Sequence, residues 1–361
     1  MSAAAWPLEP PIAPMLAKLT DSIPPKGEFL FEPKWDGFRA IVFRSDDDVF
    51  IQSRDRRPLD RYFPELHDAL LERLPPGCVL DGEVVIMTEK GLDFDLLQLR
   101  LHPAESRVAK LAQAMPASFV VFDMLAVDGI DHMNTPQQQR RALLEELLAD
   151  AEPPVYLTPM TRDRTVAGRW LQEFEGAGLD GVIAKPIDAP YQPNKRAMLK
   201  IKHARTADCV VAGFRWYRGS TDAVGSLLLG LYDDRGVLHH VGVTSSFSMA
   251  QRRALVQELE PLRANALDDH PWREWAKQDG TTRMPGGQSR WSAGKDLSWE
   301  PLRIERVCEV KYDHMQGDRF RHAATFLRWR PDKQPRDCTY DQLEVAHAYD
   351  LSRVLSTNRD D

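Results

Sequence analysis

The chain has 361 residues and a formal net charge of −7 at pH 7, with 43% hydrophobic and 28% charged residues. This composition predicts a globular protein of two domains with a sizeable apolar core. No run of about 18 apolar residues is present, which excludes a membrane-spanning helix, and the start lacks the basic and apolar regions of a secretory signal. We therefore expect a cytoplasmic protein. Its acidity argues against a protein that coats nucleic acid with its whole surface, although a local basic groove can still bind phosphates.

The first informative segment is FEPKWDGFRA, which places Lys34 in the pattern KxDGxR. This pattern is typical of enzymes that bind a nucleotide covalently to lysine. A lysine amine attacks phosphorus only when it is neutral, so its ordinary pKa of about 10.4 must be lowered by burial or by nearby cations. Arg39 supplies one such cation, and Gly37 allows a tight turn close to a phosphate. Taken alone, KWDG more often marks a solvated lysine beside a turn.

Residues 27–202 are predicted to form a mixed α+β domain. The runs 78–87 and 118–127 are rich in β-branched and aromatic residues, which is typical of strands. One helix is predicted after Thr135 and Pro136, and another is predicted to begin at Asp163 and to end at the glycines of EGAG.

The residues after Ala204 have a different character, with short apolar strands separated by turn signals. A helix is predicted from Ser248, a Gly-rich basic loop from Thr281 to Lys295, and a last pair of strands within 305–330. One helix among about five strands fits an oligonucleotide-binding (OB) fold β-barrel. The predicted fold class is therefore α+β, with a mixed α/β domain followed by an OB-fold domain. The predicted boundaries are 1–204, 205–345 and, for a polar and frayed C-terminal tail, 346–361.

Two pairs of like charges have the period of two that places side chains on one face of a strand. Asp81 and Glu83 can hold a metal ion or ribose hydroxyls, but they also fit an exposed polar face. Lys200 and Lys202 form the second pair. Because neighbouring ammonium groups repel each other and lower each other's pKa, this pair favours a triphosphate site, where an anion offsets the repulsion.

Further candidates are ambiguous when each is judged alone. The turn SRDRR carries Arg54 and Arg56, which are usual at a solvated hairpin end. Phe122 can stack on a base but also fits an apolar core. Near the end of the chain, FLRWRPDK places Arg330 and Lys333 in a cationic cluster that can neutralise a leaving pyrophosphate or can be a solvated loop.

The order of these motifs resembles the motif series of the covalent nucleotidyltransferases. The segments similar to motifs I, Ia, III, IIIa, IV, V and VI are KWDGFR, SRDRR, LDGEVV, FVVFDML, DGVIAK, LKIK and RPDK. Among these enzymes the chain is most similar to the compact, two-domain ATP-dependent DNA ligases of bacteria, of the ligase C type. PIAPMLA also resembles their entry segment, so the resemblance covers almost the whole chain. Motifs that follow one another in this order are highly specific.

The resemblance implies a role for each matching residue. The implied catalytic residues are Lys34 as the nucleophile that bonds to AMP, with Arg39, Lys200 and Lys202. The implied ATP-binding residues are Glu32 at the adenine edge, Phe122 at the adenine face, Arg39, Arg54, Glu83, Lys185, Lys200, Lys202, Arg330 and Lys333. The implied ligands of Mg²⁺ or Mn²⁺ are Glu83 and Asp180, and the implied DNA contacts are Arg54, Arg56, Arg319 and Arg321. Asp180 departs from the family, which commonly carries glutamate there, so its shorter side chain must approach Mg²⁺ more closely.

The implied reaction seals nicks with a 3′-hydroxyl and a 5′-phosphate. Lys34 attacks the α-phosphate of ATP and releases pyrophosphate, AMP then moves to the 5′-phosphate, and the 3′-hydroxyl displaces it. Lys200 and Lys202 are expected to neutralise the phosphate and, by repulsion, to keep Lys34 deprotonated. The expected partners are nicked double-stranded DNA and repair proteins. The expected form is a monomer in the bacterial cytoplasm, without membrane contact, that associates with the nucleoid during repair.

Other functions fit the same residues. An RNA ligase or a GTP-using mRNA guanylyltransferase would share the nucleophile, and the labelling nucleotide or the sealed nucleic acid distinguishes them. A non-catalytic nick-binding protein is disfavoured because an unused site has no reason to keep clustered lysines. An NAD⁺-dependent ligase is disfavoured because the known enzymes of that kind are longer chains with an extra leading domain and a four-cysteine zinc module, and this sequence shows neither pattern.

Overall fold

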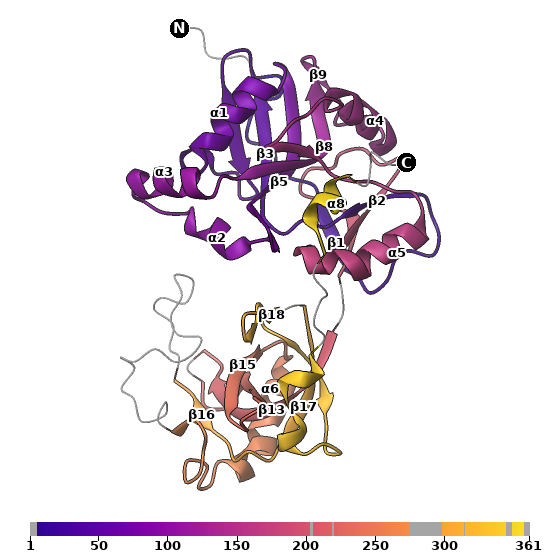
Figure 1. Ribbon diagram of the computed structural model, residues 1–361. Coiled ribbons are helices and arrows are strands. Elements are labelled where there is room, and N and C mark those ends of the chain that lie inside the picture. Colours follow the sequence, from indigo (N-terminus) through magenta and orange to yellow (C-terminus); the bar gives the residue numbers. More distant parts are fainter. Residues whose placement is uncertain are drawn as a thin grey trace. The chain divides into compact units, whose positions relative to one another are not determined.

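The structure is a computed structural model that describes residues 6–202, 205–218, 220–273, 298–313, 315–343 and 349–356 (Figure 1). The chain forms two compact units. Unit 1 comprises Met1–His203 and Ala346–Asp361, and unit 2 comprises Ala204–Val345. The basic loop expected from Thr281 to Lys295 lies outside the described residues.

One sheet of unit 1 has the strand order β1-β12-β11-β2. Its strands are β1 (Leu16–Thr20), β12 (Arg196–Ile201), β11 (Val182–Pro186) and β2 (Phe29–Pro33). The pair β1 and β12 is parallel, and the other two pairs are antiparallel. Ile183 of β11 is in register with Glu32 on one side and with Lys200 on the other. This register brings together segments that are far apart in the sequence.

A second sheet of unit 1 has the strand order β10-β8-β5-β3-β4, with β9 paired to β8. Its strands are β3 (Phe38–Arg44), β4 (Val49–Ser53), β5 (Cys78–Val85), β8 (Ser118–Val127), β9 (Ile130–Asp131) and β10 (Val155–Leu157). A small hairpin follows β5 and consists of β6 (Met87–Thr88) and β7 (Gly91–Leu92). The strands predicted at 78–87 and 118–127 are thus confirmed as β5, which is followed by β6, and β8. Their continuous apolar runs have both faces buried.

The helices of unit 1 are α1 (Pro64–Arg73), α2 (Phe94–Leu99), α3 (Glu105–Ala114), α4 (Gln137–Leu147), α5 (Arg164–Glu173) and α8 (Leu351–Ser356), with 3₁₀ turns η1 (Asp60–Tyr62) and η2 (Phe174–Ala177). The predicted cap of α5 is confirmed, because the Asp163 side chain accepts a hydrogen bond from the Thr165 amide. The chain leaves η2 at Gly178, whose φ of 86° suits glycine. Helix α4 begins one residue later than predicted, because Pro136 is its extended N-cap.

The residues after Tyr349 differ from the frayed tail that we expected. Leu351 and Val354 of α8 are buried in an apolar cluster of unit 1, and the ring centre of Tyr349 lies 5.3 Å from that of Phe174. Residues three apart share one face of a helix, so a polar composition concealed an apolar side. The prediction of a frayed tail is wrong for Leu351–Ser356.

The main sheet of unit 2 has the strand order β15-β14-β13-β17-β20, with β16 paired to β13. Its strands are β13 (Arg205–Trp216), β14 (Val224–Tyr232), β15 (Leu238–Thr244), β16 (Glu300–Pro301), β17 (Val307–Tyr312) and β20 (Thr325–Trp329), and β18 (Met315–Gln316) pairs with β19 (Arg319–Phe320). A bridge between Thr244, at the end of β15, and Ala324, just before β20, joins the two edges of the sheet. This bridge closes the sheet towards a barrel, which agrees with the predicted OB fold.

One α-helix, α6 (Met249–Leu259), interrupts the described strands of unit 2, as predicted. Ser248 and Gln251 form a capping box at its start, and Leu255 and Leu259 are buried in the core of the unit. The 3₁₀ turns of unit 2 are η3 (Glu260–Leu262), η4 (Pro335–Asp337) and η5 (Tyr340–Gln342). The mixed α+β fold class is therefore confirmed.

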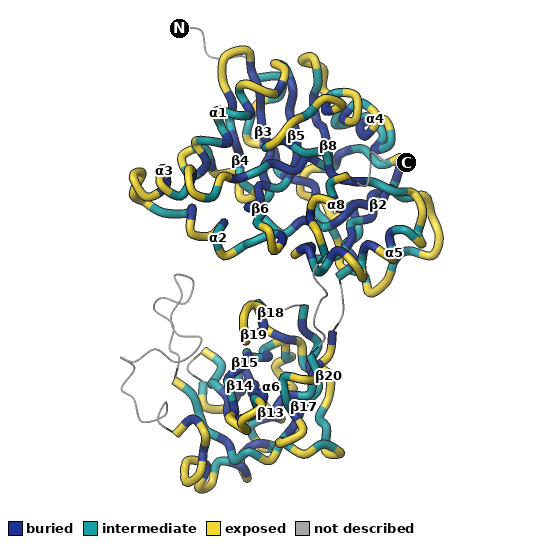
Figure 2. The backbone as a smooth tube through the Cα atoms, in the orientation of Figure 1, coloured by how far each residue is buried: buried dark blue, intermediate teal, exposed yellow. Residues whose placement is uncertain are grey.

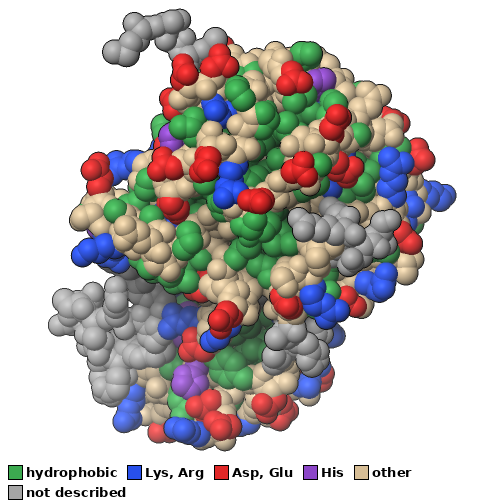
Figure 3. All heavy atoms as spheres, turned by 45° about the horizontal axis from the view of Figure 1, so that its top comes forward, with side chains coloured by type: hydrophobic (Ala, Val, Ile, Leu, Met, Phe, Trp, Pro, Cys, Tyr) green, Lys and Arg blue, Asp and Glu red, His purple; other side chains and the backbone are tan. Residues whose placement is uncertain are grey.

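Burial follows the strands in both units, and exposed loops surround them (Figure 2). On the face shown in Figure 3, acidic, basic and apolar side chains are interspersed. Among the helices of the described residues, none has both the length and the apolar character that crossing a bilayer requires.

Candidate active site

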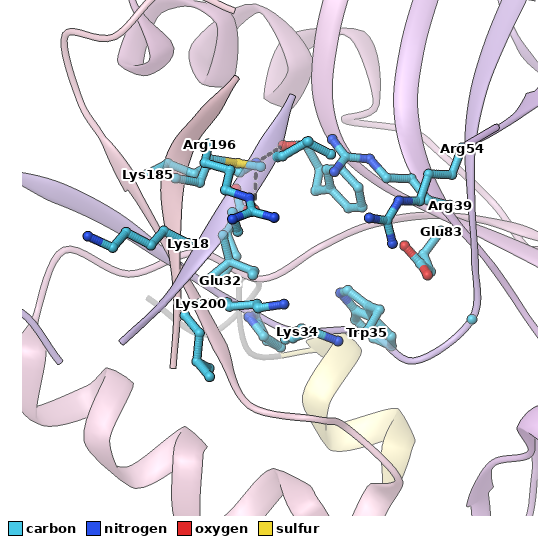
Figure 4. Close-up of a pocket in the computed structure, with 18 residues that line it drawn as sticks. Lys18, Glu32, Lys34, Trp35, Arg39, Arg54, Glu83, Lys185, Arg196 and Lys200 are labelled. Carbon is cyan, nitrogen blue, oxygen red and sulfur yellow. Dashed lines mark hydrogen bonds and ion pairs between the residues drawn. The ribbon is translucent and has the colours of Figure 1, made fainter. Parts of the chain in front are cut away.

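A pocket of about 460 Å³ opens between the two sheets of unit 1 (Figure 4). Its walls come from β1, β2, β11 and β12 of one sheet, from β3, β5 and β8 of the other, and from the segment after β2. The predicted site residues that line it are Glu32, Lys34, Arg39, Arg54, Glu83, Phe122, Lys185 and Lys200. The sequence therefore identified side chains from both sheets that meet in one cavity.

Lys34 follows β2 directly and belongs to a cluster of charged side chains. Its Nζ lies 2.6 Å from Oδ2 of Asp180, and Nζ of Lys202 lies 2.8 Å from the same oxygen. The backbone reinforces the cluster, since the Lys34 amide donates to the Gly181 carbonyl and the Asp180 amide donates to the Lys34 carbonyl. The β2 end and the segment before β11 are thus held together at the nucleophile.

Gly181 makes this approach possible. Its φ is 136°, and a Cβ at this position would lie 2.0 Å from the carbonyl oxygen of Ile201. Only glycine fits such a close contact between two backbones. The bend that it allows directs Asp180 towards Lys34, while Lys185 on β11 lines the pocket.

Asp180 controls the protonation of Lys34 in this arrangement. Burial lowers the pKa of Lys34, but the charge and the hydrogen bond of Asp180, together with the charges of Glu83 and Asp36, raise it, and the net result is a raised pKa. Lys34 is therefore protonated before nucleotide binds. The prediction that neighbouring lysines keep Lys34 deprotonated is wrong for this state, because it left out the counterion.

Lys200 shows the repulsion that the sequence predicted. Burial lowers its pKa, and the positive charges of Lys202, Lys34 and Arg54 lower it further. The lowering of the Lys200 pKa by burial and by these cations thus exceeds the raising of the same pKa by Asp180. This excess of positive charge at the pocket wall suits a polyphosphate.

Glu32 lies at another wall of the pocket in a buried network. Its Oε2 lies 2.7 Å from Nζ of Lys185, and its Oε1 lies 3.5 Å from Nη1 of Arg141 on α4. Lys185 also donates to the Phe122 carbonyl, and its Nζ lies 5.0 Å from the centre of the Phe122 ring. The side chains of Glu32, Arg141 and Lys185 are each 2% exposed, so contacts within the protein fix their positions.

Arg39 is held against the floor of the pocket by Asp81. The Arg39 guanidinium donates Nε to Oδ1 at 2.9 Å and Nη2 to Oδ2 at 2.6 Å, and the Tyr191 hydroxyl donates to Oδ2 at 2.7 Å. The guanidinium carbon also lies 5.2 Å from the centre of the Phe122 ring. Asp81 therefore fixes Arg39, which leaves Glu83 as the member of the Asp81 and Glu83 pair that lines the pocket.

Comparisons with known proteins agree with this geometry. The model of the family "ATP dependent DNA ligase domain" matches residues 14–202, and that of "ATP dependent DNA ligase C terminal region" matches residues 220–333. DNA ligase C2 of Mycolicibacterium smegmatis is 57% identical over 342 residues, which cover 94% of this chain and 96% of the relative. The chain belongs to the ATP-dependent DNA ligases.

Further relatives place this ligase within the family. DNA ligase C of Mycobacterium tuberculosis is 54% identical over 355 residues, which cover 97% of this chain and 98% of the relative. A solved structure of a Lig E DNA ligase has a TM-score of 0.55 and 18% identity, and the match covers 88% of this chain and 99% of that chain. This structural likeness shows the fold alone. The predicted similarity to compact ligases of the C type and their ATP-dependent DNA joining is confirmed.

Glu83 fits a divalent cation better than Asp180 does. Burial raises the pKa of Glu83 to about 7 against the opposing charges of Lys34 and Arg39, so a further cation would stabilise its ionised form. Asp180 is instead neutralised by two lysines. Among the described side chains, no group of three or more His, Cys, Asp or Glu could hold a metal. An ion in this ligase would therefore need phosphate and water ligands as well, which is usual for Mg²⁺.

The other predicted residues lie outside the pocket. Those in unit 2 are Arg319, Arg321, Arg330 and Lys333. Arg330 donates to Asp208 at 2.9 Å and to Asp332 at 2.8 Å, and Nζ of Lys333 lies 4.0 Å from Asp208. Arg56 is exposed in the turn after β4, with a φ of 61°. Arg330 is thus paired with two carboxylates, and its side chain is only 15% exposed.

Some pocket residues of the ligase were missed in the sequence. Arg196 and Met198 line the pocket beside Lys200. The period of two that linked Lys200 to Lys202 extends back to both of them, so the pattern contained a usable signal. Lys18 of β1 also lines the pocket, and no motif marks it.

Proposed function

We propose that this ligase seals nicks with a 3′-hydroxyl and a 5′-phosphate during DNA repair, through AMP bound to Lys34 and then through adenylated DNA. The observation that supports it is the cluster of Lys34, Lys200 and Lys202 around the carboxylate of Asp180 beside one pocket. The cations around Lys200 lower its pKa more than Asp180 raises it, and a triphosphate would neutralise this local excess of positive charge.

In the first step, Nζ of Lys34 forms a bond to the α-phosphorus while the bond to the leaving pyrophosphate breaks. Lys34, which is 21% exposed, must first release its proton to solvent and leave Asp180. Once that ion pair opens, the main influence that raises the pKa of Lys34 is removed, and burial favours the neutral amine. Lys202 keeps Asp180 paired during this change, and Lys200 is placed to neutralise the α-phosphate.

The nucleotide would bind along the pocket walls. Glu32 and Phe122 are assigned to the adenine edge and face, with Lys185 holding both in place. Arg39 and Arg54, which lie across the pocket from Glu32 and Lys185 in Figure 4, are assigned to the ribose and phosphates. Glu83 would hold Mg²⁺ or Mn²⁺, which supplies charge neutralisation for the phosphates when it is bound. We assign Asp180 to the control of Lys34 in place of the metal role first expected.

The later steps use the DNA. AMP moves from Lys34 to the 5′-phosphate, and the 3′-hydroxyl then attacks that phosphorus and expels AMP. Arg330 and Lys333 are assigned to the pyrophosphate of the first step. The assigned DNA contacts are Arg54, Arg56, Arg319 and Arg321. ATP and the chromosome share the bacterial cytoplasm, so we place the ligase there. We further propose that it acts as a monomer and that repair proteins recruit it.

Nick sealing tests this proposal. A labelled duplex with one nick is incubated with ATP and Mg²⁺ beside matched nicks in RNA, and nick binding is measured in parallel. We expect DNA sealing that requires ATP and is lost in Lys34→Ala while nick binding persists. Tight binding of the nick without any sealing by the unaltered protein would show a scaffold instead of an enzyme, and preferential sealing of RNA would show an RNA ligase.

A further inference from the structure

Arg141, on α4, lies behind the pocket wall and in none of the ligase motifs noted above. Its side chain is 2% exposed and is fixed on two sides, because Nη2 donates to the Thr158 carbonyl at 2.9 Å and Nε donates to Glu145 at 2.7 Å. Its remaining nitrogen, Nη1, lies 3.5 Å from Oε1 of Glu32. A charged group is thus held at a constant place beside a carboxylate that lines the nucleotide pocket.

The geometry between Arg141 and Glu32 is unusual for a buried pair. Within the described residues, neither Oε1 of Glu32 nor Nη1 of Arg141 has a hydrogen-bond partner, although both atoms are buried. Lys185 occupies the other carboxylate oxygen at 2.7 Å. Arg141 therefore places a positive charge beside Glu32 without donating a hydrogen bond to it, and the Glu32 carboxylate, which also pairs with Lys185, lines the pocket.

We propose that Arg141 is a positioning residue that sets nucleotide specificity by keeping Glu32 an ionised hydrogen-bond acceptor towards the base. This inference rests on the proposed adenylation of Lys34. An ionised carboxylate only accepts hydrogen bonds, so it favours the amine at C6 of adenine. A protonated carboxyl group can donate, so it would accommodate the C6 carbonyl of hypoxanthine or guanine.

The charges around Glu32 support this assignment. Burial raises the pKa of Glu32, and the cations Lys185, on β11, and Arg141, on α4, lower it, whereas Asp123, on β8, raises it. Burial has the largest effect, so the pKa of Glu32 is raised overall. Removal of the Arg141 charge would therefore raise the pKa of Glu32 further and would populate the protonated form at a higher pH.

The test compares ATP with inosine triphosphate (ITP), which differs at C6 without the 2-amino group of GTP. Each nucleotide carries label on its α-phosphate, and the rate of label transfer to the protein is measured from pH 5.5 to 7.5. The triphosphates are the same, so their ionisation cancels in the ratio of the two rates. We expect the unaltered protein to prefer ATP, with a preference that falls as the pH is lowered.

Three variants separate charge from packing. Arg141→Met should reduce the preference for ATP over ITP about tenfold at pH 7.5. A protonated Glu32 would no longer distinguish the C6 amine of adenine from the C6 carbonyl of hypoxanthine. Arg141→Lys keeps the charge and should retain most of the preference. Arg100→Met is the matched control, because Arg100 is also buried, lies 2.7 Å from Glu65 and does not line the pocket. It should lower stability without changing the preference.

Each outcome decides between the possibilities. An unchanged preference in a folded Arg141→Met, or an equal loss in Arg141→Lys, would overturn the inference and leave Arg141 a packing residue. If Arg141→Met does not fold, the pH series of the unaltered protein decides, since a preference that is flat from pH 5.5 to 7.5 contradicts control by Glu32 ionisation. Absence of any label from ATP in the unaltered protein would instead refute the proposed function.

Discussion

Lys34 and Asp180 form a 2.6 Å ion pair that must open before Lys34 can attack a phosphate. The pair raises the pKa of Lys34 above its ordinary value, so the free protein holds its nucleophile in the protonated form. This partly buried pair fixes the position of the amine until a nucleotide competes for the lysines. Reactivity therefore depends on the charges that surround Lys34, and Lys200 is the clearest case to test.

Replacement of Lys200 by methionine should separate stability from activity. Its ammonium is destabilised by burial and by three nearby cations, so its removal should leave the melting temperature unchanged or higher. Label transfer from ATP should fall by at least about a hundredfold, because a charge that neutralises the α-phosphate is lost. Thermal melting and label transfer measure the two effects.

Lys110→Met is the control for that variant, since Lys110 is an exposed residue of α3 that does not line the pocket. Both its melting temperature and its label transfer should match the unaltered protein. A Lys200→Met protein that melts several degrees lower would show that Lys200 supports the fold, which contradicts the charge balance described for it.

For single residues, the sequence indicated which charged side chains belong to the site, but it did not indicate which residues pair with them. Lys34, Lys200 and Glu83 are found by motif and by strand period. The carboxylate that pairs with Lys34 lies 146 positions further along the chain, at Asp180, and was assigned to a metal. Arg141 had no signal at all. Long-range pairs depend on strand order, which a single sequence does not specify.

Between elements, the approach of β11 to β12 depends on Gly181. We expect Gly181→Ala to destabilise unit 1 by about 3 kcal/mol or more, because its Cβ would lie 2.0 Å from a backbone oxygen. The same displacement would move Asp180 away from Lys34, so label transfer should also fall. Chemical denaturation and label transfer together check this expectation.

Gly129→Ala provides the comparison, since Gly129 also has a positive φ, of 74°, but no atom lies within 4 Å of an added Cβ. Strain alone should cost about 1 kcal/mol there and leave label transfer intact. Equal losses in the two variants would mean that the crowding at Gly181 has no effect of its own.

The element predictions succeeded where patterns are local. Strands β5 and β8 and the capped starts of α5 and α6 follow from apolar runs and capping residues within a few positions. Helix α8 was missed because its apolar residues Leu351, Val354 and Leu355 are interspersed with polar ones near the chain end, and their burial depends on Phe174 and the rest of the unit 1 cluster. Tertiary packing stabilises that helix, and local composition does not reveal it.

For the molecule as a whole, the charge of −7 must be reconciled with binding to DNA. Acidic and basic groups are interspersed on the face in Figure 3, so we expect binding through a limited set of Arg and Lys side chains. The affinity for nicked duplex should fall steeply as salt rises, since phosphate contacts release counterions. A plot of log affinity against log salt concentration measures this slope.

Arg319→Ala and Arg321→Ala should each reduce the magnitude of that slope by about one if each side chain contacts a phosphate. Arg235→Ala, an exposed arginine in the turn between β14 and β15, serves as the control and should leave the slope unchanged. A slope near zero for the unaltered protein is incompatible with phosphate-dominated binding.

Covalent labelling of Lys34 tests the central claim most directly. The protein is incubated with ATP labelled on the α-phosphate and a divalent metal ion, and the modified peptide is identified by mass spectrometry. We predict one acid-labile phosphoramidate on Lys34, release of pyrophosphate in equal amount, and no label in Lys34→Ala. Label on another residue, or equal labelling of Lys34→Ala, would contradict the account.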